Sequence, residues 1–112
     1  MAIVTPKLGL PYLSVSQAQK EVTHNQALDF MDFFIQPVVV SRLATPPTTL
    51  VEGNAYIIIA TATGVWVGLE GKVARYINGT WSYYTPFEGL GVWSVADARD
   101  YIYHSSAWIL RP

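Results

Sequence analysis

The chain has 112 residues, of which 51% are hydrophobic and only 13% are charged, and its net charge is −1. This length predicts one domain that can bury a core, and the charge balance leaves no basic surface for a nucleic-acid partner. The sequence has no cysteine, which excludes disulfides and thiolate metal sites. High hydrophobicity with so little charge indicates that part of the surface faces other chains.

Residues 1–13 predict an extended N-terminal arm. Pro6 and Pro11 disfavour a helix there, and with Lys7 and Gly9 they interrupt the apolar run that a signal peptide requires. The longest apolar stretch, residues 55–69, is too short to span a bilayer. We therefore expect no membrane partner and no secretion by this route. An apolar arm must cover either its own domain or a neighbouring subunit.

Residues 14–36 predict one long helix, from about residue 15 to residue 35. Ser14 and Gln17 fit a capping box at its start, and Pro37 prevents its continuation. The second half, residues 27–35, is apolar on nearly every side of the cylinder, which indicates burial on every side. A domain this small cannot enclose such a helix alone, so we expect part of it to contact another copy or partner.

The same helix supplies the predicted assembly interface. Residues 17–26 are rich in Gln and Asn, whose amides can fix the register of an oligomer through buried hydrogen bonds. The alternative is a solvated polar face. With the apolar turns that follow, the interface is expected to use Val22, Gln26, Leu28, Met31 and Phe34.

Residues 37–112 predict an antiparallel β-meander. Short β-branched and aromatic segments alternate with Gly, Asn, Asp and Pro signals, and Asn78-Gly79 is typical of a hairpin turn. The expected strands cover residues 37–43, 55–61, 64–69, 72–77, 80–85, 91–96, 100–104 and 107–110.

A weak repeat lies within this β-rich region. A shift of 27 positions places residues 64–83 on residues 91–110. The shift superimposes two Gly-Val-Trp segments, at 64–66 and 91–93, and it matches YINGTW (76–81) with YHSSAW (103–108). We therefore expect two related β-units beside one helix, in an α+β fold.

No motif predicts an enzyme, a cofactor or a metal site. His24 and His104 have no ligand-type residues at metal-binding spacing. Asp29 and Asp32 lie one helical turn apart and are interpreted as a solvated or interface strip. Since no nucleophile, phosphate-binding or dinucleotide fingerprint occurs either, no residue is assigned a catalytic role.

The aromatic residues allow two interpretations. Exposed tyrosine and tryptophan rings beside a turn can bind a sugar ring, and Tyr76, Trp81, Tyr103 and Trp108 are the candidate glycan contacts. The same residue types also fill the cores and interfaces of small β-proteins. Because the tyrosine–tryptophan spacing recurs in two predicted hairpins, packing is the preferred interpretation.

Four segments of the chain resemble an uncharacterised phage domain family. They are LPYLSVSQAQKEVTHNQAL (residues 10–28), GNAYIIIATATGVWVG, NGTWSYYTPFEG and the final AWIL. That family occurs in tailed phages, prophages and gene-transfer agents, in host-specificity, tail-fibre and head-spike proteins. The resemblance covers about residues 8–110, and the family has no established catalytic residues to transfer.

The resemblance implies a non-enzymatic virion protein, made in the host cytoplasm and assembled as a homo-oligomer, with a trimer expected. Because larger relatives carry their receptor-binding regions after this domain, we expect a small part of the virion. It would be a capsid decoration or cement protein, a spike base or a tail adaptor that contacts other virion proteins. The alternative is a carbohydrate-binding module at the host surface.

Overall fold

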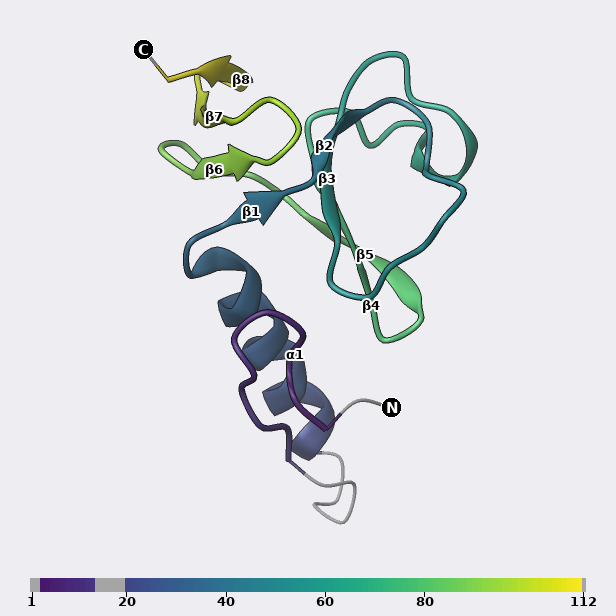
Figure 1. Cartoon of the computed structure of the whole chain (residues 1–112), viewed down its shortest axis with the longest axis vertical. Coiled ribbons are helices and arrows are strands. Elements are labelled where there is room, and N and C mark those ends of the chain that lie inside the picture. The colour runs from purple at the N-terminus through teal and green to yellow at the C-terminus, as the bar shows by residue number, and fades with distance from the viewer. Residues whose placement is uncertain (1–2, 14–19, 112) are drawn as a thin grey trace. The chain divides into compact units, whose positions relative to one another are not determined.

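The computed structural model describes residues 3–13 and 20–111, and its helix side chains are described from His24 onward. The predicted capping box and Val22 therefore lie outside the residues and side chains described. The chain divides into two compact units, Met1–Gln36 and Pro37–Pro112, called here the N-terminal unit and the β-unit (Figure 1). The α+β class, with a helix followed by strands, is confirmed.

The N-terminal unit consists of the arm and helix α1, Lys20–Phe34. The arm folds back on itself through a bridge between Val4 and Pro11. It is fastened along α1 by Asn25, whose side chain bonds both the amide and the carbonyl of Leu13, and by Asp29, which accepts from the Tyr12 hydroxyl. The arm thus covers one face of its own helix.

Asp32 makes the central hydrogen bonds between α1 and the arm. Its carboxylate is fully buried and accepts from the Thr5 hydroxyl at 2.6 Å and from the backbone amides of Lys7 at 3.0 Å and Leu8 at 2.6 Å. The expectation that Asp29 and Asp32 form a solvated or interface strip is therefore wrong for Asp32. A buried carboxylate requires such donors, and the arm backbone provides them.

Lys7 closes the carboxyl end of α1. Its Nζ donates to the carbonyls of Phe33 at 3.2 Å, Ile35 at 2.5 Å and Gln36 at 2.8 Å. The last turn of the helix has no basic residue of its own, so the arm supplies the cation that the exposed carbonyls and the helix dipole favour.

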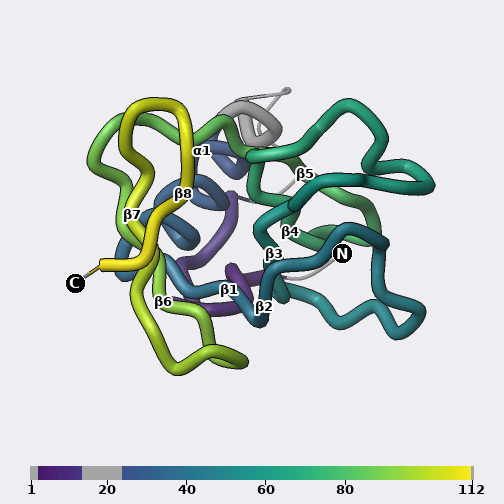
Figure 2. The backbone as a smooth tube through the Cα atoms, turned by 90° about the horizontal axis from the view of Figure 1, so that it is seen from above, coloured from purple at the N-terminus to yellow at the C-terminus, as the bar shows by residue number. Residues whose placement is uncertain are grey.

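The β-unit contains two four-stranded sheets, and Figure 2 views them along a second direction. One sheet has the order β1-β6-β7-β8 and the other the order β2-β3-β4-β5. The strand bounds are β1 Val38–Val39, β2 Ser41–Leu43, β3 Ala55–Ile58, β4 Val73–Ile77, β5 Thr80–Tyr84, β6 Gly91–Ser94, β7 Arg99–His104 and β8 Ala107–Leu110. The expected purely antiparallel meander is wrong in one respect, because β1–β6 and β2–β3 pair in parallel. One extended segment, residues 38–43, thereby supplies an edge strand to each sheet.

The two sheets have equivalent registers. Ala55 opposite Arg75 corresponds to Gly91 opposite Ile102, and Tyr76 opposite Trp81 corresponds to Tyr103 opposite Trp108. The first strands are offset by 36 positions and the hairpins by 27. Between equivalent register positions, the segment from β3 to β4 is therefore nine residues longer than the segment from β6 to β7.

The repeat predicted from the sequence is not confirmed as residues 64–83 on 91–110. Its hairpin portions occupy equivalent places, but its two Gly-Val-Trp segments do not. Residues Gly64–Trp66 form a 3-10 helix in the long loop, whereas residues 91–93 begin strand β6. Trp66 is accordingly 0% exposed and Trp93 is 42% exposed. The strand expected over residues 64–69 is wrong for the same reason.

Trp66 is central to the core on one face of the β2-β3-β4-β5 sheet. Its ring lies 5.2 Å from that of Trp81 and 6.1 Å from that of Tyr56. The buried members of this cluster are Tyr56, Ile58, Ala62, Trp66 and Ala74. The extra loop thus carries an aromatic residue that covers the sheet.

The opposite face of this sheet meets the other sheet. The Arg42 guanidinium lies 4.6 Å from the centroid of the Tyr101 ring and 3.7 Å from the Asp97 carboxylate. In addition, the Trp108 indole donates to the Gly71 carbonyl at 2.8 Å. These contacts join side chains on the inner face of the β1-β6-β7-β8 sheet to the β2-β3-β4-β5 half.

Candidate functional site

Two features of the described residues could carry function: an apolar stripe on α1 and a polar cluster at the β7–β8 turn. The described helix has two opposite stripes, each with side chains at the spacing i, i+3, i+4, i+7, which share one helix face. The stripe that faces the arm contains Asn25, Leu28, Asp29 and Asp32, and the other contains Ala27, Phe30, Met31 and Phe34.

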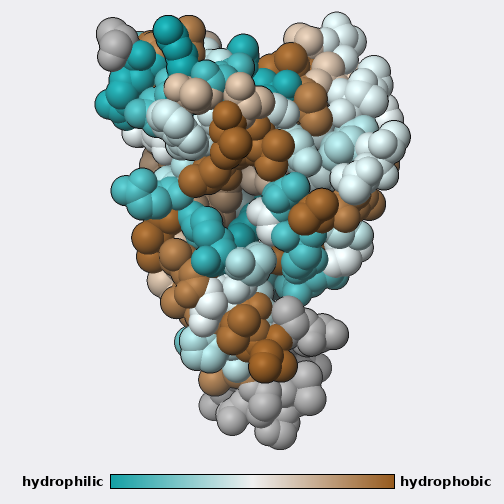
Figure 3. Space-filling view, in the orientation of Figure 1, coloured by the Kyte–Doolittle hydropathy of each residue, from teal (hydrophilic) through white to brown (hydrophobic). Residues whose placement is uncertain are grey.

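The second group, called here the apolar stripe, is accessible to solvent. Phe30 is 50% exposed and Met31 is 45% exposed, and the rings of Phe30 and Phe34 stack with centroids 6.2 Å apart. Figure 3 shows hydrophobic residues reaching the surface of the protein. Among the described side chains of this stripe none is charged, so its exposure to water costs hydrophobic free energy that a partner could recover.

The predicted interface residues are divided between these faces. Met31 and Phe34 lie on the apolar stripe, while Leu28 is buried on the stripe that faces the arm. Gln26 is exposed beside the apolar stripe, and the side chain of Val22 lies outside the described set. Phe30 is the contributor that sequence reasoning left out. The arm contacts that distinguish the two faces of the helix are not encoded in its periodicity.

The candidate glycan contacts form two equivalent pairs. Tyr76 and Trp81 have ring centroids 5.4 Å apart, and Tyr103 and Trp108 have centroids 5.2 Å apart, both edge to face. All four are half-buried. Trp81 also packs on the Trp66 core, and Trp108 bonds a backbone carbonyl. These contacts favour packing, and glycan binding stays a prediction.

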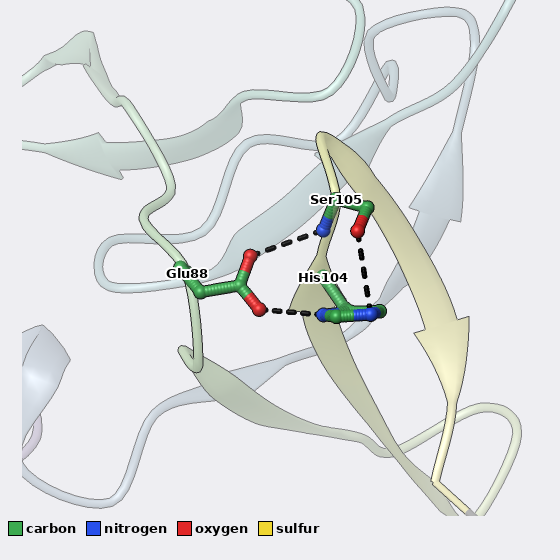
Figure 4. Close-up of polar contacts among 3 residues, drawn as sticks. All are labelled: Glu88, His104 and Ser105. Atoms are coloured by element: carbon green, nitrogen blue, oxygen red, sulfur yellow. Dashed lines mark hydrogen bonds and ion pairs between the residues drawn. The ribbon is translucent and has the colours of Figure 1, made fainter.

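The polar cluster consists of Glu88, His104 and Ser105 (Figure 4). His104 Nδ1 lies 2.5 Å from Glu88 Oε2, and the Ser105 hydroxyl lies 3.3 Å from His104 Nε2. The order carboxylate, imidazole, hydroxyl is that of a serine-hydrolase triad. Yet His104 and Glu88 are 59% and 65% exposed, whereas such catalysis needs oxyanion donors in a site shielded from water.

A comparison of the two hairpins shows the structural role of the Glu88 carboxylate. Glu88 accepts from the Ser105 amide at 3.0 Å, and Glu52 accepts from the Asn78 amide at 2.7 Å at the equivalent turn. Asn78 occupies the place in the β4–β5 turn that Ser105 occupies in the β7–β8 turn. The hydrogen bond from the turn amide to the glutamate therefore needs neither a histidine nor a serine. The common role of the two glutamates is to hold a turn.

The two turns differ in backbone strain. Asn78 and Gly79 have φ of 55° and 77°, and Ser105 and Ser106 have φ of 51° and 65°. Positive φ at both central residues is typical of a tight hairpin turn and favours Asn-Gly. We expect Ser106→Gly to raise the free energy of unfolding by about 1 kcal/mol, because glycine adopts this conformation without the side-chain clash. Chemical denaturation measures the change. The reciprocal Gly79→Ser is the matched control and should lower stability by a similar amount; equal stabilities would contradict the assignment.

Two carboxylates make the β1-β6-β7-β8 sheet sensitive to acid. The pKa of Glu88 is lowered from its ordinary value of 4.5 by hydrogen bonds from His104 and the Ser105 amide. The pKa of Asp97 is lowered from 3.8 by hydroxyl donors on Tyr101 and Ser94 and by the charge of Arg42. Each lowered pKa stabilises the fold above the unfolded-state value, and this stabilisation is lost as pH falls through the folded-state value.

We therefore expect the melting temperature to fall as pH drops below about 4.5. The double variant Glu88→Gln and Asp97→Asn should melt lower at pH 7 and depend less on pH between 5 and 3. Differential scanning calorimetry at both ends of this range measures the slopes. A double variant with the same slope as the parent protein would contradict the role of these carboxylates.

Neither surface carries the ligand set of a metal site or a membrane anchor. Among the described residues, no group of three His, Cys, Asp or Glu side chains could hold a metal ion. In the part of the chain that the structure covers, no helix is long and apolar enough to cross a bilayer.

Comparison with known proteins gives a family and no named relative. No curated protein matches the chain. Residues 24–109, most of the chain, match the family described as a protein of unknown function, DUF2793. This match spans most of the helix and nearly all of the β-unit, from His24 to Ile109. On that extent, the chain belongs to the DUF2793 family.

Proposed function

We propose that this protein is a non-enzymatic structural protein of a tailed-phage or related virion. It acts there as a small oligomeric module: a capsid decoration or cement protein, a spike base or a tail adaptor. The phage setting comes from the resemblance of residues 10–28 and the later segments to the virion domain family. The structural support is the solvent exposure of the apolar stripe of α1, which is the single observation on which assembly depends.

Assembly through this stripe follows from its geometry. Ala27, Phe30, Met31 and Phe34 form a seam of the kind that packs against a second helix. The two carboxylates among the described helix side chains, Asp29 and Asp32, are engaged by the arm on the other face, so neither would be buried in the seam. Copies of the helix around a symmetry axis remove the apolar stripe from water, and three copies match the expected symmetry.

The test combines oligomeric state with virion content. Sedimentation equilibrium should give a defined oligomer, whereas Phe30→Glu with Met31→Glu should give a monomer with an unchanged far-ultraviolet spectrum. Val65→Glu with Val67→Glu, two exposed apolar positions on the loop between β3 and β4, is the matched control and should stay oligomeric. Mass spectrometry of purified particles should then detect the parent protein at a fixed copy number. A monomeric protein that is also absent from particles would overturn the proposal.

A further inference from the structure

The outer face of the β1-β6-β7-β8 sheet is a second apolar surface, built from residues of the β-unit. The paired residues of neighbouring strands place four apolar side chains on this face: Val38, Trp93, Ile102 and Ile109. Trp93 is 42% exposed and Ile109 is 43% exposed. The residues of the opposite face of the same strands, such as Val39, Val92 and Tyr101, are buried.

Equivalence with the other sheet shows that this exposure is unusual for the fold. The register correspondence matches Trp93 with Ile57 and Ile102 with Arg75. Ile57 and Arg75 are each 1% exposed. The position of Ile57, covered on one sheet, is thus open on the other, where Trp93 is the larger apolar side chain. At the second position the apolar Ile102 replaces the charged Arg75 and is half-buried.

The polar residues of the outer face are self-complementary. Asp100 lies opposite Trp93 in the register, and the Arg111 guanidinium lies 3.9 Å from the Asp100 carboxylate. Arg111 also reaches across the sheet, because a Cβ placed on Gly91 would lie 3.0 Å from its terminal nitrogen. Both charged side chains stay about half exposed. A surface with an apolar centre, one acid and one base can pair with itself, since a twofold rotation brings unlike charges together.

We infer that the outer face binds the same face of a second copy in a twofold contact. The inference rests on the β-unit alone and goes beyond the proposed helix assembly, which it would extend by joining one oligomer to the next. Sheets of four strands spaced by about 4.8 Å bury only several hundred Å² when they meet, which is below the roughly 1,000 Å² of a stable complex. The contact is therefore weak in solution and dependent on concentration, with a Kd on the order of 10 μM to 1 mM.

The cysteine-free sequence allows a direct test by site-specific cross-linking. Ile109→Cys places the only thiol on the outer face, and Val67→Cys, an exposed position on the loop between β3 and β4, is the matched control. Both are made with Phe30→Glu and Met31→Glu, so that the outcome does not depend on the helix. With a short bismaleimide, the Ile109→Cys protein should form covalent dimers roughly tenfold faster than the control, and Trp93→Glu should abolish the difference. Equal rates would overturn the twofold contact while leaving helix assembly intact.

Charge reversal gives the second arm of the test. In the Ile109→Cys protein, Asp100→Arg alone and Arg111→Asp alone should each slow cross-linking by roughly five- to tenfold, because each places like charges across the axis. A mixture of the two reversed proteins should recover most of the rate as mixed dimers, which mass spectrometry distinguishes. If the mixture cross-links no faster than either protein alone, the proposed charge complementarity is wrong.

Discussion

Replacing Trp66 by alanine is expected to lower the free energy of unfolding by about 3–5 kcal/mol. The side chain is fully buried and meets Tyr56 and Trp81 edge to face or tilted. Its removal leaves a cavity under the long loop that the neighbouring rings cannot fill. Because a domain of this size is stable by only about 5–15 kcal/mol, this loss removes much of the stability of the β-unit. Urea denaturation followed by circular dichroism measures it.

Trp93→Ala is the matched control, since the dipeptide Gly-Val precedes both tryptophans in the sequence. Trp93 lies on the exposed outer face, so its loss should cost about 1 kcal/mol or less. Trp66→Phe should cost less than Trp66→Ala, because it keeps a ring and removes a buried indole N–H that has no partner among the described residues. Equal losses for the two alanine variants would mean that the tryptophans are equivalent and would contradict the loop assignment.

Local signals were sufficient to predict the helix, most strands and the Asn78-Gly79 turn. Each depends on residues close in sequence: Pro37 ends the helix, and alternating β-branched and aromatic residues make strands. The sequence also predicted both hairpins, in which Tyr76 pairs with Trp81 and Tyr103 with Trp108; the relation between the two units stays a prediction. The edge strands Val38–Val39 and Ser41–Leu43 were predicted as one β-segment, but no local signal shows that it serves two sheets in parallel.

The repeat was misaligned for a physical reason. A single shift of 27 cannot register a unit whose first strand has moved by 36, and the two Gly-Val-Trp segments that it superimposes form a 3-10 helix and the start of a strand. The sequence feature that matches the first strands is the pair Glu52-Gly53 and Glu88-Gly89, which are also 36 positions apart. Both glutamates hold a hairpin turn, and the Gly53 and Gly89 amides bond the carbonyls of Tyr76 and Tyr103. Recognising this pair requires knowledge of which strands are neighbours.

The face of the helix that is available for assembly could not be predicted either. Residues 27–35 are apolar all round, so periodicity alone does not select a stripe. Contacts with the arm determine which face of the helix is exposed. The side chains that make these contacts look like ordinary polar residues in the sequence. Asn25 and Asp32 bond the arm backbone and so turn Phe30 and Met31 toward solvent.

Asp32→Ala should therefore release the arm and destabilise the N-terminal unit by about 3–5 kcal/mol. The substitution leaves the Thr5 hydroxyl and the amides of Lys7 and Leu8 without their acceptor in a buried site, and unpaired buried donors are costly. Asp32→Asn keeps the size and one acceptor oxygen but faces these donors with its own amide protons, so an intermediate loss is expected.

Hydrogen exchange measured by mass spectrometry gives the readout, since it follows the arm separately from the β-unit. In Asp32→Ala, the peptide that covers residues 3–13 should exchange at least tenfold faster than in the parent protein, while peptides from β3 to β8 should be unchanged. Gln26→Ala, at an exposed position of the same helix, should leave the arm protected. Unchanged protection in Asp32→Ala would show that the arm is held without this carboxylate. Faster exchange would show that the arm contacts opposite the apolar stripe depend on Asp32.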